Sequence, residues 1–324
     1  MSKLQVVVLG GTGFIGSHVA EQLLEAEYPV TALVRRHSPE SDRLKYWGAS
    51  VQIVDFGDEQ ALLQAFKGHT ILVNCIAYVK VHASLEELNK VQVDLTLRVH
   101  YAALLAGISH HLMLSTVEVY GFRGPVTKQE TNRYYPEFNF QYSCYAKEEA
   151  FIRLMEKTDC RYAILQPACT IGAYENGSSF FRELYQLHQQ DSYPLISGGR
   201  AKVAVVDTRD IGLAMVWLAD HSNITGEKFL LSGYDTTWLG IKEAIDNYRG
   251  ITSQTRSVPY SLALTATQLT TALLPYRYSP RYTPLAIKLM GADVLIDDTK
   301  LRATGFSTQY HLSDSVANAI EDFG

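Results

Sequence analysis

The sequence predicts an α/β fold, in which a doubly wound parallel sheet is joined to a smaller, interleaved C-terminal portion that covers a substrate. Two observations support this prediction. Short β-branched runs alternate with helical patterns through the first half of the chain, which is typical of βαβ units. The first run, "LQVVVLG" at 4–10, is apolar throughout, as expected for a strand buried on both faces of a parallel sheet.

The alternation can be followed along the chain. Later strands are expected at 30–36, 51–56, 70–77, 111–116, 161–168 and 228–233. One helix between them is closed by Gly68, and a long helix over roughly 86–106 ends at Gly107. His110 and His111 precede a strand and are expected in a loop. After about residue 170, prolines divide the chain, so we expect an irregular, partly helical portion there.

Composition narrows the class of protein. At 324 residues the chain can bury a large core in one or two coupled domains. A net charge of −5 gives no electrostatic reason to expect nucleic acid or an anionic membrane as partner. The four cysteines show no metal-ligand spacing, and reduced, packed thiols are expected. No signal sequence and no apolar run of roughly 18 residues is visible, so a cytoplasmic protein without an integral membrane segment is expected.

A glycine-rich turn joins the first strand to an amphipathic helix. In "VVVLGGTGFIGSHVAEQLL", Gly10, Gly13 and Gly16 allow a tight turn and a close approach of the backbone to a pyrophosphate. The N-terminus of the following helix offers free N–H groups and a partial positive charge to the same anion. The turn therefore predicts a dinucleotide-binding sheet of the Rossmann type.

The second strand ends in "LVRRHS", with Arg35 and Arg36 and no acidic residue. An acidic side chain at this place accepts from the 2′-hydroxyl of NAD, whereas arginine accommodates the 2′-phosphate of NADP. Two guanidinium groups can pair with a phosphate dianion, so NADP(H) is favoured over NAD(H). The alternative is a pair of solvated surface arginines.

Three motifs together give the chain a family resemblance. With "GGTGFIG" before a helix, "STVEVYG" at 115–121 and "YAKEEA" at 145–150, it resembles the extended or atypical short-chain dehydrogenase/reductases of the NAD(P)-dependent epimerase/dehydratase superfamily. The resemblance covers nearly the whole chain and is closest in character to the 3β-hydroxysteroid dehydrogenase/dihydroflavonol reductase branch. It implies a coenzyme-binding set of Gly10, Gly11, Thr12, Gly13, Phe14, Ile15, Gly16, Arg35, Arg36, Asp55, Phe56, Cys75, Ile76, Ala77, Lys147 and Pro167.

The resemblance also implies a catalytic set. Thr116, four residues before Tyr120, matches the hydroxyl residue that positions a substrate carbonyl. Lys147 matches the lysine that holds the nicotinamide ribose and lowers the pKa of a neighbouring tyrosine. Gln166 replaces the usual arginine beside the nicotinamide, and Gln92 stands where a helix asparagine is common.

The expected catalytic tyrosine is absent. The family spacing is Tyr-x-x-x-Lys, because residues four apart on a helix share a face, and the residue four before Lys147 is Ser143. Tyr142 is rotated about 100° further around the helix, and Tyr145 lies on nearly the opposite side. Serine cannot simply replace a phenol whose pKa is about 10.

Three interpretations remain open. In the first, substrate, water or another tyrosine (Tyr142, Tyr134 or Tyr135) fills the space beside Ser143, so Tyr142 and Ser143 join Thr116 and Lys147 as candidate catalytic residues. In the second, the chain binds NADP(H) without catalysis, as a sensor or assembly protein. In the third, Thr116 and Lys147 suffice.

The C-terminal half suggests the substrate class. We expect a dinucleotide-binding domain over 1–170, completed by about 203–233, and a cap over 171–202 and 234–324. The stretch 258–297 is mostly apolar, which favours a hydrophobic or aromatic alcohol or carbonyl substrate; a nucleotide-sugar epimerase or dehydratase is an alternative. That stretch includes Tyr276, Tyr278 and Tyr282, with Arg277 and Arg281 keeping an anionic substrate open. A homodimer through helices near 86–106 and 145–157 is a further expectation.

Overall fold

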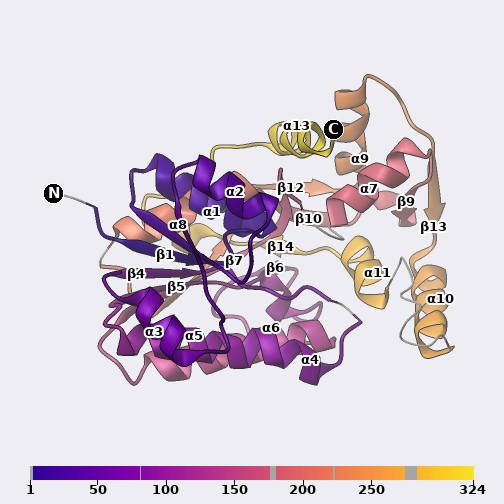
Figure 1. Ribbon diagram of the computed structural model, residues 1–324. Helices are drawn as coiled ribbons and strands as arrows, with labels where there is room; N and C mark the ends of the chain where they lie inside the picture. The colour runs from indigo at the N-terminus through magenta and orange to yellow at the C-terminus, as the bar shows by residue number, and fades with distance from the viewer. Residues whose placement is uncertain (1–2, 81, 176–179, 222, 274–282) are drawn as a thin grey trace.

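The computed structural model describes residues 3–80, 82–175, 180–221, 223–273 and 283–324. Its centre is a seven-stranded sheet in the order β11-β7-β5-β4-β1-β2-β3, in which every pairing is parallel (Figure 1). The strands are β1 (Val6–Leu9), β2 (Val30–Val34), β3 (Ser50–Ile53), β4 (Ile71–Asn74), β5 (His110–Leu114), β7 (Arg161–Pro167) and β11 (Glu227–Leu231). The predicted doubly wound parallel sheet is confirmed.

Two layers of helices cover the sheet. Helices α1 (Phe14–Glu25) and α8 (Thr208–Asp220) lie on one face, and α3 (Glu59–Phe66), α5 (Thr96–Leu105) and α6 (Asn139–Met155) lie on the other (Figure 1). Because alternate residues of a strand point to opposite faces, Val6 and Val8 pack toward α1, while Val7 and Leu9 pack toward α3 and α5. Both faces are buried, which explains the uninterrupted apolar strands.

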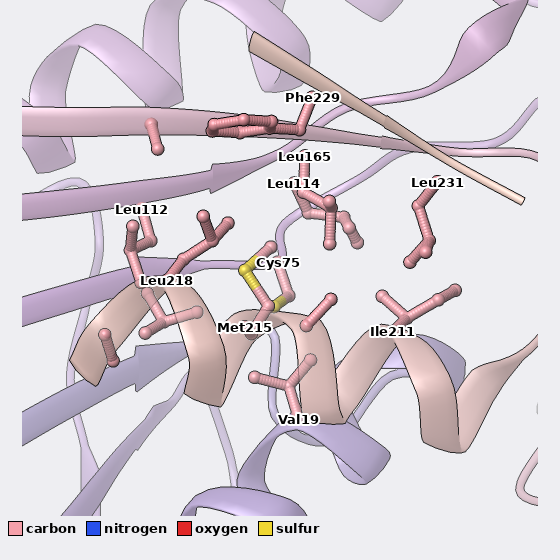
Figure 2. Close-up of a cluster of buried hydrophobic side chains, with 14 of the residues drawn as sticks. Val19, Cys75, Leu112, Leu114, Leu165, Ile211, Met215, Leu218, Phe229 and Leu231 are labelled. Carbon is pink, nitrogen blue, oxygen red and sulfur yellow. The ribbon is translucent and has the colours of Figure 1, made fainter. Parts of the chain in front are cut away.

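The face under α1 and α8 is one continuous apolar layer. Figure 2 shows Val19 of α1 and Met215 of α8 facing side chains from the sheet. The two helices approach closely at Gly212, where an added Cβ would lie 2.7 Å from the His18 carbonyl oxygen. Residues far apart in sequence therefore form a single core.

The strand order places a crevice at the carboxyl edge of the sheet. Strand β1 has β2 on one side and β4 on the other, so the chain leaves it in one direction and later returns in the opposite direction. In open sheets, ligands bind outside the carboxyl ends of strands at such a switch point. The glycine-rich turn follows β1 at this point.

Two details of the predicted elements differ in the structure. The prediction that His110 and His111 lie in a loop is wrong: both begin β5 and are fully buried. The long helix at 86–106 consists of α4 (Leu85–Asn89), a π-helical segment (Lys90–Leu95) and α5. A π segment inserts an extra residue into a helical turn, and such segments often occur at functional sites.

The C-terminal half is more regular than predicted. It has its own apolar core, which includes Phe181, Trp238, Ile241 and Val316. Its further elements are α7 (Phe180–Gln189), α9 (Trp238–Arg249), α10 (Tyr260–Leu273), α11 (Pro284–Gly291), α12 (Thr299–Arg302), α13 (Leu312–Phe323), β8 (Cys169–Ile171), β9 (Tyr193–Ile196), β10 (Lys202–Asp207), β12 (Tyr234–Thr237) and β13 (Thr255–Val258). The remaining elements are α2 (Pro39–Tyr46), short 3₁₀ turns at Val117–Tyr120 and Ser197–Gly199, and the paired strands β6 (Thr127–Lys128) and β14 (Leu295–Ile296).

Some predictions about this half stay predictions. Tyr276, Tyr278, Tyr282, Arg277 and Arg281 lie outside the described residues. The two domain boundaries are likewise expectations from the sequence. Within the described parts of the chain, no helix combines the length and apolar character that crossing a bilayer requires.

Candidate active site

The glycine turn after β1 is shaped by close backbone contacts. Gly10 has φ of 76°, and an added Cβ would lie 2.8 Å from the carbonyl carbon and oxygen of Cys75. At Gly16, an added Cβ would lie 2.1 Å from the Gly10 carbonyl oxygen. Neither position has room for a side chain, so the first and third glycines are required by packing.

The turn leaves the N-terminus of α1 suited to an anion. Gly13 is the N-cap residue, no side-chain cap hydrogen bond is present there in the described chain, and the first turn contains no acidic residue. Thr12, Gly13, Phe14 and Ile15 are partly exposed, whereas Gly11 is buried. Unpaired N–H groups at a helix N-terminus bind phosphate, so this cradle fits the pyrophosphate of a dinucleotide.

The residues predicted to bind the adenosine part of the coenzyme lie at the ends of the neighbouring strands. Arg35 and Arg36 follow β2 and are exposed. Beyond β3, Asp55 is exposed and accepts a 2.8 Å hydrogen bond from the Gly57 N–H, while Phe56 is buried. These four residues are thus at the carboxyl edge where the resemblance places adenosine.

Arg43 is a cation near the glycine turn that no sequence motif indicates. It lies on α2, and its Nη2 donates to Ser17 Oγ at 2.9 Å. Ser17 Oγ in turn donates to the Gly13 carbonyl at 2.8 Å. The guanidinium stacks on the Tyr174 ring, 4.1 Å from its centroid. This arginine therefore braces the start of α1.

Lys147 points into the carboxyl edge of the sheet. Its Nζ donates to the carbonyl oxygens of Ile76 at 2.9 Å and Leu114 at 3.0 Å, just past β4 and at the end of β5. Only 2% of the residue is exposed, and burial lowers the pKa of Lys147. The ammonium is therefore held beside the segment that includes Cys75 and Ala77, and it does not project into bulk water.

The two hydroxyl residues after β5 have different surroundings. Thr116 is partly exposed and caps the following 3₁₀ turn, with its Oγ1 accepting from the Glu118 N–H at 3.2 Å. Ser115 donates to the buried carboxylate of Glu148. Of the two, Thr116 keeps a hydroxyl hydrogen available for a substrate.

Ser143 lies on the same face of α6 as Lys147. It is fully buried, and its Oγ has no hydrogen-bond partner among the described residues. Tyr142 is 46% exposed, and the Tyr145 ring packs edge-on against Tyr134, with centroids 5.4 Å apart. The hydroxyl group of Tyr134 donates to Glu148 Oε2 at 2.6 Å. The orphaned serine hydroxyl therefore marks the place where the family spacing requires a phenol.

Glu118 is a titratable group at this edge that sequence reasoning missed. Its Oε2 accepts from Gln141 Nε2 at 3.0 Å, and burial raises the pKa of Glu118. Burial raises the pKa of Cys144, the residue next to Ser143, and the nearby Glu118 carboxyl group acts in the same direction. A carboxyl group two residues after Thr116 in "STVEVYG" was the available signal.

A buried polar network lies behind the site. Gln166 accepts from Tyr120 OH at 3.0 Å and donates from Nε2 to Glu148 Oε1 at 2.8 Å. Lys228 Nζ donates to Tyr134 OH at 2.8 Å. Gln166 thus joins the sheet to α6, and Pro167 follows it as a buried residue at the end of β7.

Gln92 lies in the π-helical segment and faces α6. Its Nε2 is 3.5 Å from Cys144 Sγ, and its Oε1 has no partner within the described chain. Two buried acceptors, on Gln92 and Ser143, therefore lack donors beside Lys147. Such orphaned polar atoms call for an explanation, and a bound ligand or water would satisfy them.

A surface pocket of about 420 Å³ opens at the N-terminal end of α6. It is lined by Arg123, Tyr134, Tyr135, Pro136, Glu137 and Tyr142. Tyr134 connects this pocket to the Glu148 network.

The described residues contain no group of three or more His, Cys, Asp or Glu side chains that could hold a metal ion. The four cysteines are free, and Cys75 and Cys144 are buried.

Comparisons with known proteins agree on one family. The family described as "NAD dependent epimerase/dehydratase family" matches residues 6–231. A putative dihydroflavonol 4-reductase from Synechocystis is 25% identical over 98% of this chain and 93% of its own length. The 4-hydroxy-2-methyl-3-oxo-4-farnesyl-3,4-dihydroquinoline-1-oxide ketoreductase of Stigmatella aurantiaca is 21% identical over 92% of this chain and 90% of its own length.

Solved structures show the same fold. A UDP-glucose-4-epimerase from Stenotrophomonas maltophila, with bound NAD and formylated UDP-arabinopyranose, superimposes with a TM-score of 0.81. It is 15% identical and the alignment covers 99% of this chain and 98% of that one. At this identity the likeness concerns the fold alone.

Proposed function

The chain belongs to the NAD-dependent epimerase/dehydratase family, and from this premise we propose that it is an NADP(H)-dependent oxidoreductase acting on a hydrophobic or aromatic alcohol or carbonyl. The observation that carries the proposal is the Lys147 ammonium, held by two backbone carbonyls at the carboxyl edge of the sheet. A lysine is seldom buried without a function or a charged partner, and this one faces the crevice that follows the glycine turn.

Lys147 and Thr116 have separate roles in the proposed reaction. The bound coenzyme supplies or takes up a hydride at the substrate carbon. Lys147 has a third N–H beyond its two backbone bonds, and in the proposal it holds the nicotinamide ribose. The Thr116 hydroxyl donates to the substrate carbonyl oxygen, and its own bond to the Glu118 N–H fixes its direction.

The proton must come from a group other than tyrosine. Glu118 is the candidate, because it lies two residues after Thr116 and because burial raises its pKa, which favours the protonated form of its carboxyl group. In the reduction direction, its proton passes to the substrate oxygen as the hydride arrives at carbon, and the product is an alcohol.

Coenzyme and substrate preferences rest on separate observations. Arg35 and Arg36 are exposed at the end of β2, where they can pair with a 2′-phosphate. The tyrosines of the surface pocket favour an aromatic substrate group. The substrate preference agrees with the names of the dihydroflavonol 4-reductase and the dihydroquinoline-oxide ketoreductase, whose alignments span most of this chain.

A second candidate function is supported by Ser143. A protein that binds NADP(H) without turnover would retain the glycine cradle and Lys147 but not need the phenol. Calorimetry with NADPH and NADH, followed by absorbance assays of reduced nicotinamide across aromatic and aliphatic ketones, separates the first two possibilities. Epimerisation and dehydration cause no net change in the nicotinamide, so nucleotide sugars are tested by chromatography of their products.

The expected result is tighter binding of NADPH than of NADH, with turnover of aromatic ketones that Glu118→Gln slows. Tight NADPH binding without turnover, together with activity gained by Ser143→Tyr but not by Tyr142→Phe, would favour the silent binder. Turnover of nucleotide sugars alone would favour an epimerase or dehydratase. No affinity for either dinucleotide would refute both proposals.

A further inference from the structure

A chain of hydrogen bonds runs through the buried layer beneath the carboxyl ends of β4 and β5. Asn74 at the end of β4, His100 on α5 and His111 on β5 are all fully buried. The Ile76 N–H donates to Asn74 Oδ1 at 3.0 Å, and at the other end His111 Nε2 lies 3.2 Å from the Ile108 carbonyl oxygen. Between them, Asn74 Nδ2 is 3.1 Å from His100 Nε2, and His100 Nδ1 is 3.0 Å from His111 Nδ1.

The two ends of this chain fix the position of every proton in it. The Ile108 carbonyl can only accept, so His111 must carry its proton on Nε2 and present a lone pair at Nδ1. His100 must then donate from Nδ1 and accept at Nε2. The Ile76 N–H can only donate, so the Asn74 oxygen faces it and the Asn74 amino group faces His100. The Ile108 carbonyl at one end and the Ile76 N–H at the other therefore require the same arrangement of donors and acceptors.

This arrangement of donors and acceptors requires both imidazoles to be neutral. A proton added to His111 at Nδ1 would place two donors face to face between His100 and His111, and a proton added to His100 at Nε2 would do the same between His100 and Asn74. Burial also opposes protonation of both rings, and the centroid of the Phe151 ring lies 4.6 Å from that of His100. The positive charge of Lys147 acts on His100 in the same direction. The pKa of His111 is lowered to about 4, and that of His100 lies well below its ordinary value.

Ile76 connects this chain to Lys147. Its N–H is held by Asn74 and its carbonyl oxygen accepts from Lys147 Nζ. Ile76 follows β4, precedes an irregular stretch in which Ala77 is exposed, and has no strand partner among the described residues. The side-chain amide of Asn74 is therefore what fixes the backbone at this point.

We propose that His100 and His111 are positioning residues of the coenzyme site, which through Asn74 and Ile76 set where the Lys147 ammonium lies. This inference rests on the proposed function, in which Lys147 holds the nicotinamide ribose. In the described chain, Lys147 donates to the carbonyl oxygens of Ile76 and Leu114, so a shift of the Ile76 carbonyl would move the third N–H away from the coenzyme. The histidines themselves touch neither coenzyme nor substrate.

The first test measures the tautomer and the charge of each of the two imidazoles. Two-bond ¹H–¹⁵N spectra of the full chain with ¹⁵N-labelled histidine distinguish the Nδ1–H tautomer, the Nε2–H tautomer and the charged ring. We expect His100 as Nδ1–H and His111 as Nε2–H, with both unchanged down to about pH 5. Assignment comes from His100→Phe and His111→Asn. Two Nε2–H tautomers, or a charged ring in either residue at pH 7, would overturn the inference.

The second test measures whether the chain positions Lys147. His111→Leu removes the acceptor for His100 at similar volume, whereas His111→Asn keeps an oxygen near the place of Nδ1. We expect His111→Leu to weaken NADPH binding about tenfold, and His111→Asn to stay within about threefold of the unsubstituted chain. Adenosine 2′,5′-bisphosphate lacks the nicotinamide ribose, so its affinity should change by less than about twofold in both variants.

The comparison ligand separates positioning from general loss of structure. Equal weakening of NADPH and the bisphosphate in His111→Leu would overturn the inference, as would unchanged NADPH affinity in the folded variant. Should His111→Leu not fold, His100→Phe, which keeps a ring against Phe151 and removes both nitrogens, takes its place with the same expected values. Absence of NADPH binding by the unsubstituted chain would instead refute the proposed function, and this inference with it.

Discussion

Gly13 offers the sharpest test of where the coenzyme binds. Its φ of −86° and ψ of 171° are ordinary for any residue, and an added Cβ would meet only the Gly10 carbonyl oxygen, at 3.1 Å. A few tenths of an ångström of adjustment relieve that contact. We therefore expect Gly13→Ala to lower the free energy of unfolding by less than about 1 kcal/mol.

The same methyl group would stand at the N-terminus of α1, where the pyrophosphate is expected. Loss of one or two charge-assisted hydrogen bonds, each worth roughly 1.5–3 kcal/mol, predicts NADPH binding about 100-fold weaker. Calorimetry measures the affinity, and thermal unfolding in the absence of ligand measures the stability.

Two neighbouring glycines provide the controls. At Gly11 an added Cβ would meet Leu44 and Val8 side-chain atoms at 3.5 Å, so Gly11→Ala should leave the stability of the fold little changed. At Gly16 it would lie 2.1 Å from the Gly10 carbonyl oxygen, so Gly16→Ala should destabilise the fold by roughly 2 kcal/mol. A folded Gly13→Ala variant with unchanged NADPH affinity would refute the placement of the pyrophosphate.

Three further outcomes are expected. Replacing Arg35 and Arg36 together by alanine should weaken NADPH binding about tenfold and leave NADH binding unchanged by calorimetry, and equal losses for both would contradict the 2′-phosphate assignment. Glu118→Gln should keep NADPH affinity and lower turnover about 100-fold, since a carboxamide cannot deliver the proton; undiminished turnover excludes Glu118 as donor. The pKa of Asp246 is lowered to about 2 by its bonds to Lys242 and its neighbours, although burial alone would raise it. Its carboxylate therefore contributes roughly 2 kcal/mol to the free energy of unfolding above about pH 5, and this contribution is lost as the pH falls toward 2. The free energy of unfolding of Asp246→Asn, measured with urea, should fall less over that range than that of the unsubstituted chain.

The sheet could be predicted because its signals are local. Apolar strands and glycine-closed helices are set by neighbouring residues, and the spacing that brings Ser143 onto the face of Lys147 is a property of one helix. The acceptors of Lys147, in contrast, are carbonyls beyond β4 and at the end of β5, which no pattern on α6 reveals.

The mistaken loop at His110 and His111 has a specific cause. Two polar residues at the start of a run weaken a strand signal, but His111 is satisfied by His100 from α5 and by the Ile108 carbonyl. Those partners exist only after the layers have packed. The raised pKa of Glu118 could not be predicted for the same reason, because it depends on burial beside Gln141.

The close contact of α1 and α8 at Gly212 bears on how the protein is made. The face of the sheet that binds α1 is completed only by α8 and by β11, the edge strand that ends at Leu231. On a ribosome, the first six strands of the sheet emerge before these elements, and the part of the apolar face that α8 covers stays exposed meanwhile. We therefore expect nascent chains that stop before α8 to be captured by chaperones, and an isolated N-terminal fragment to aggregate rather than bind coenzyme.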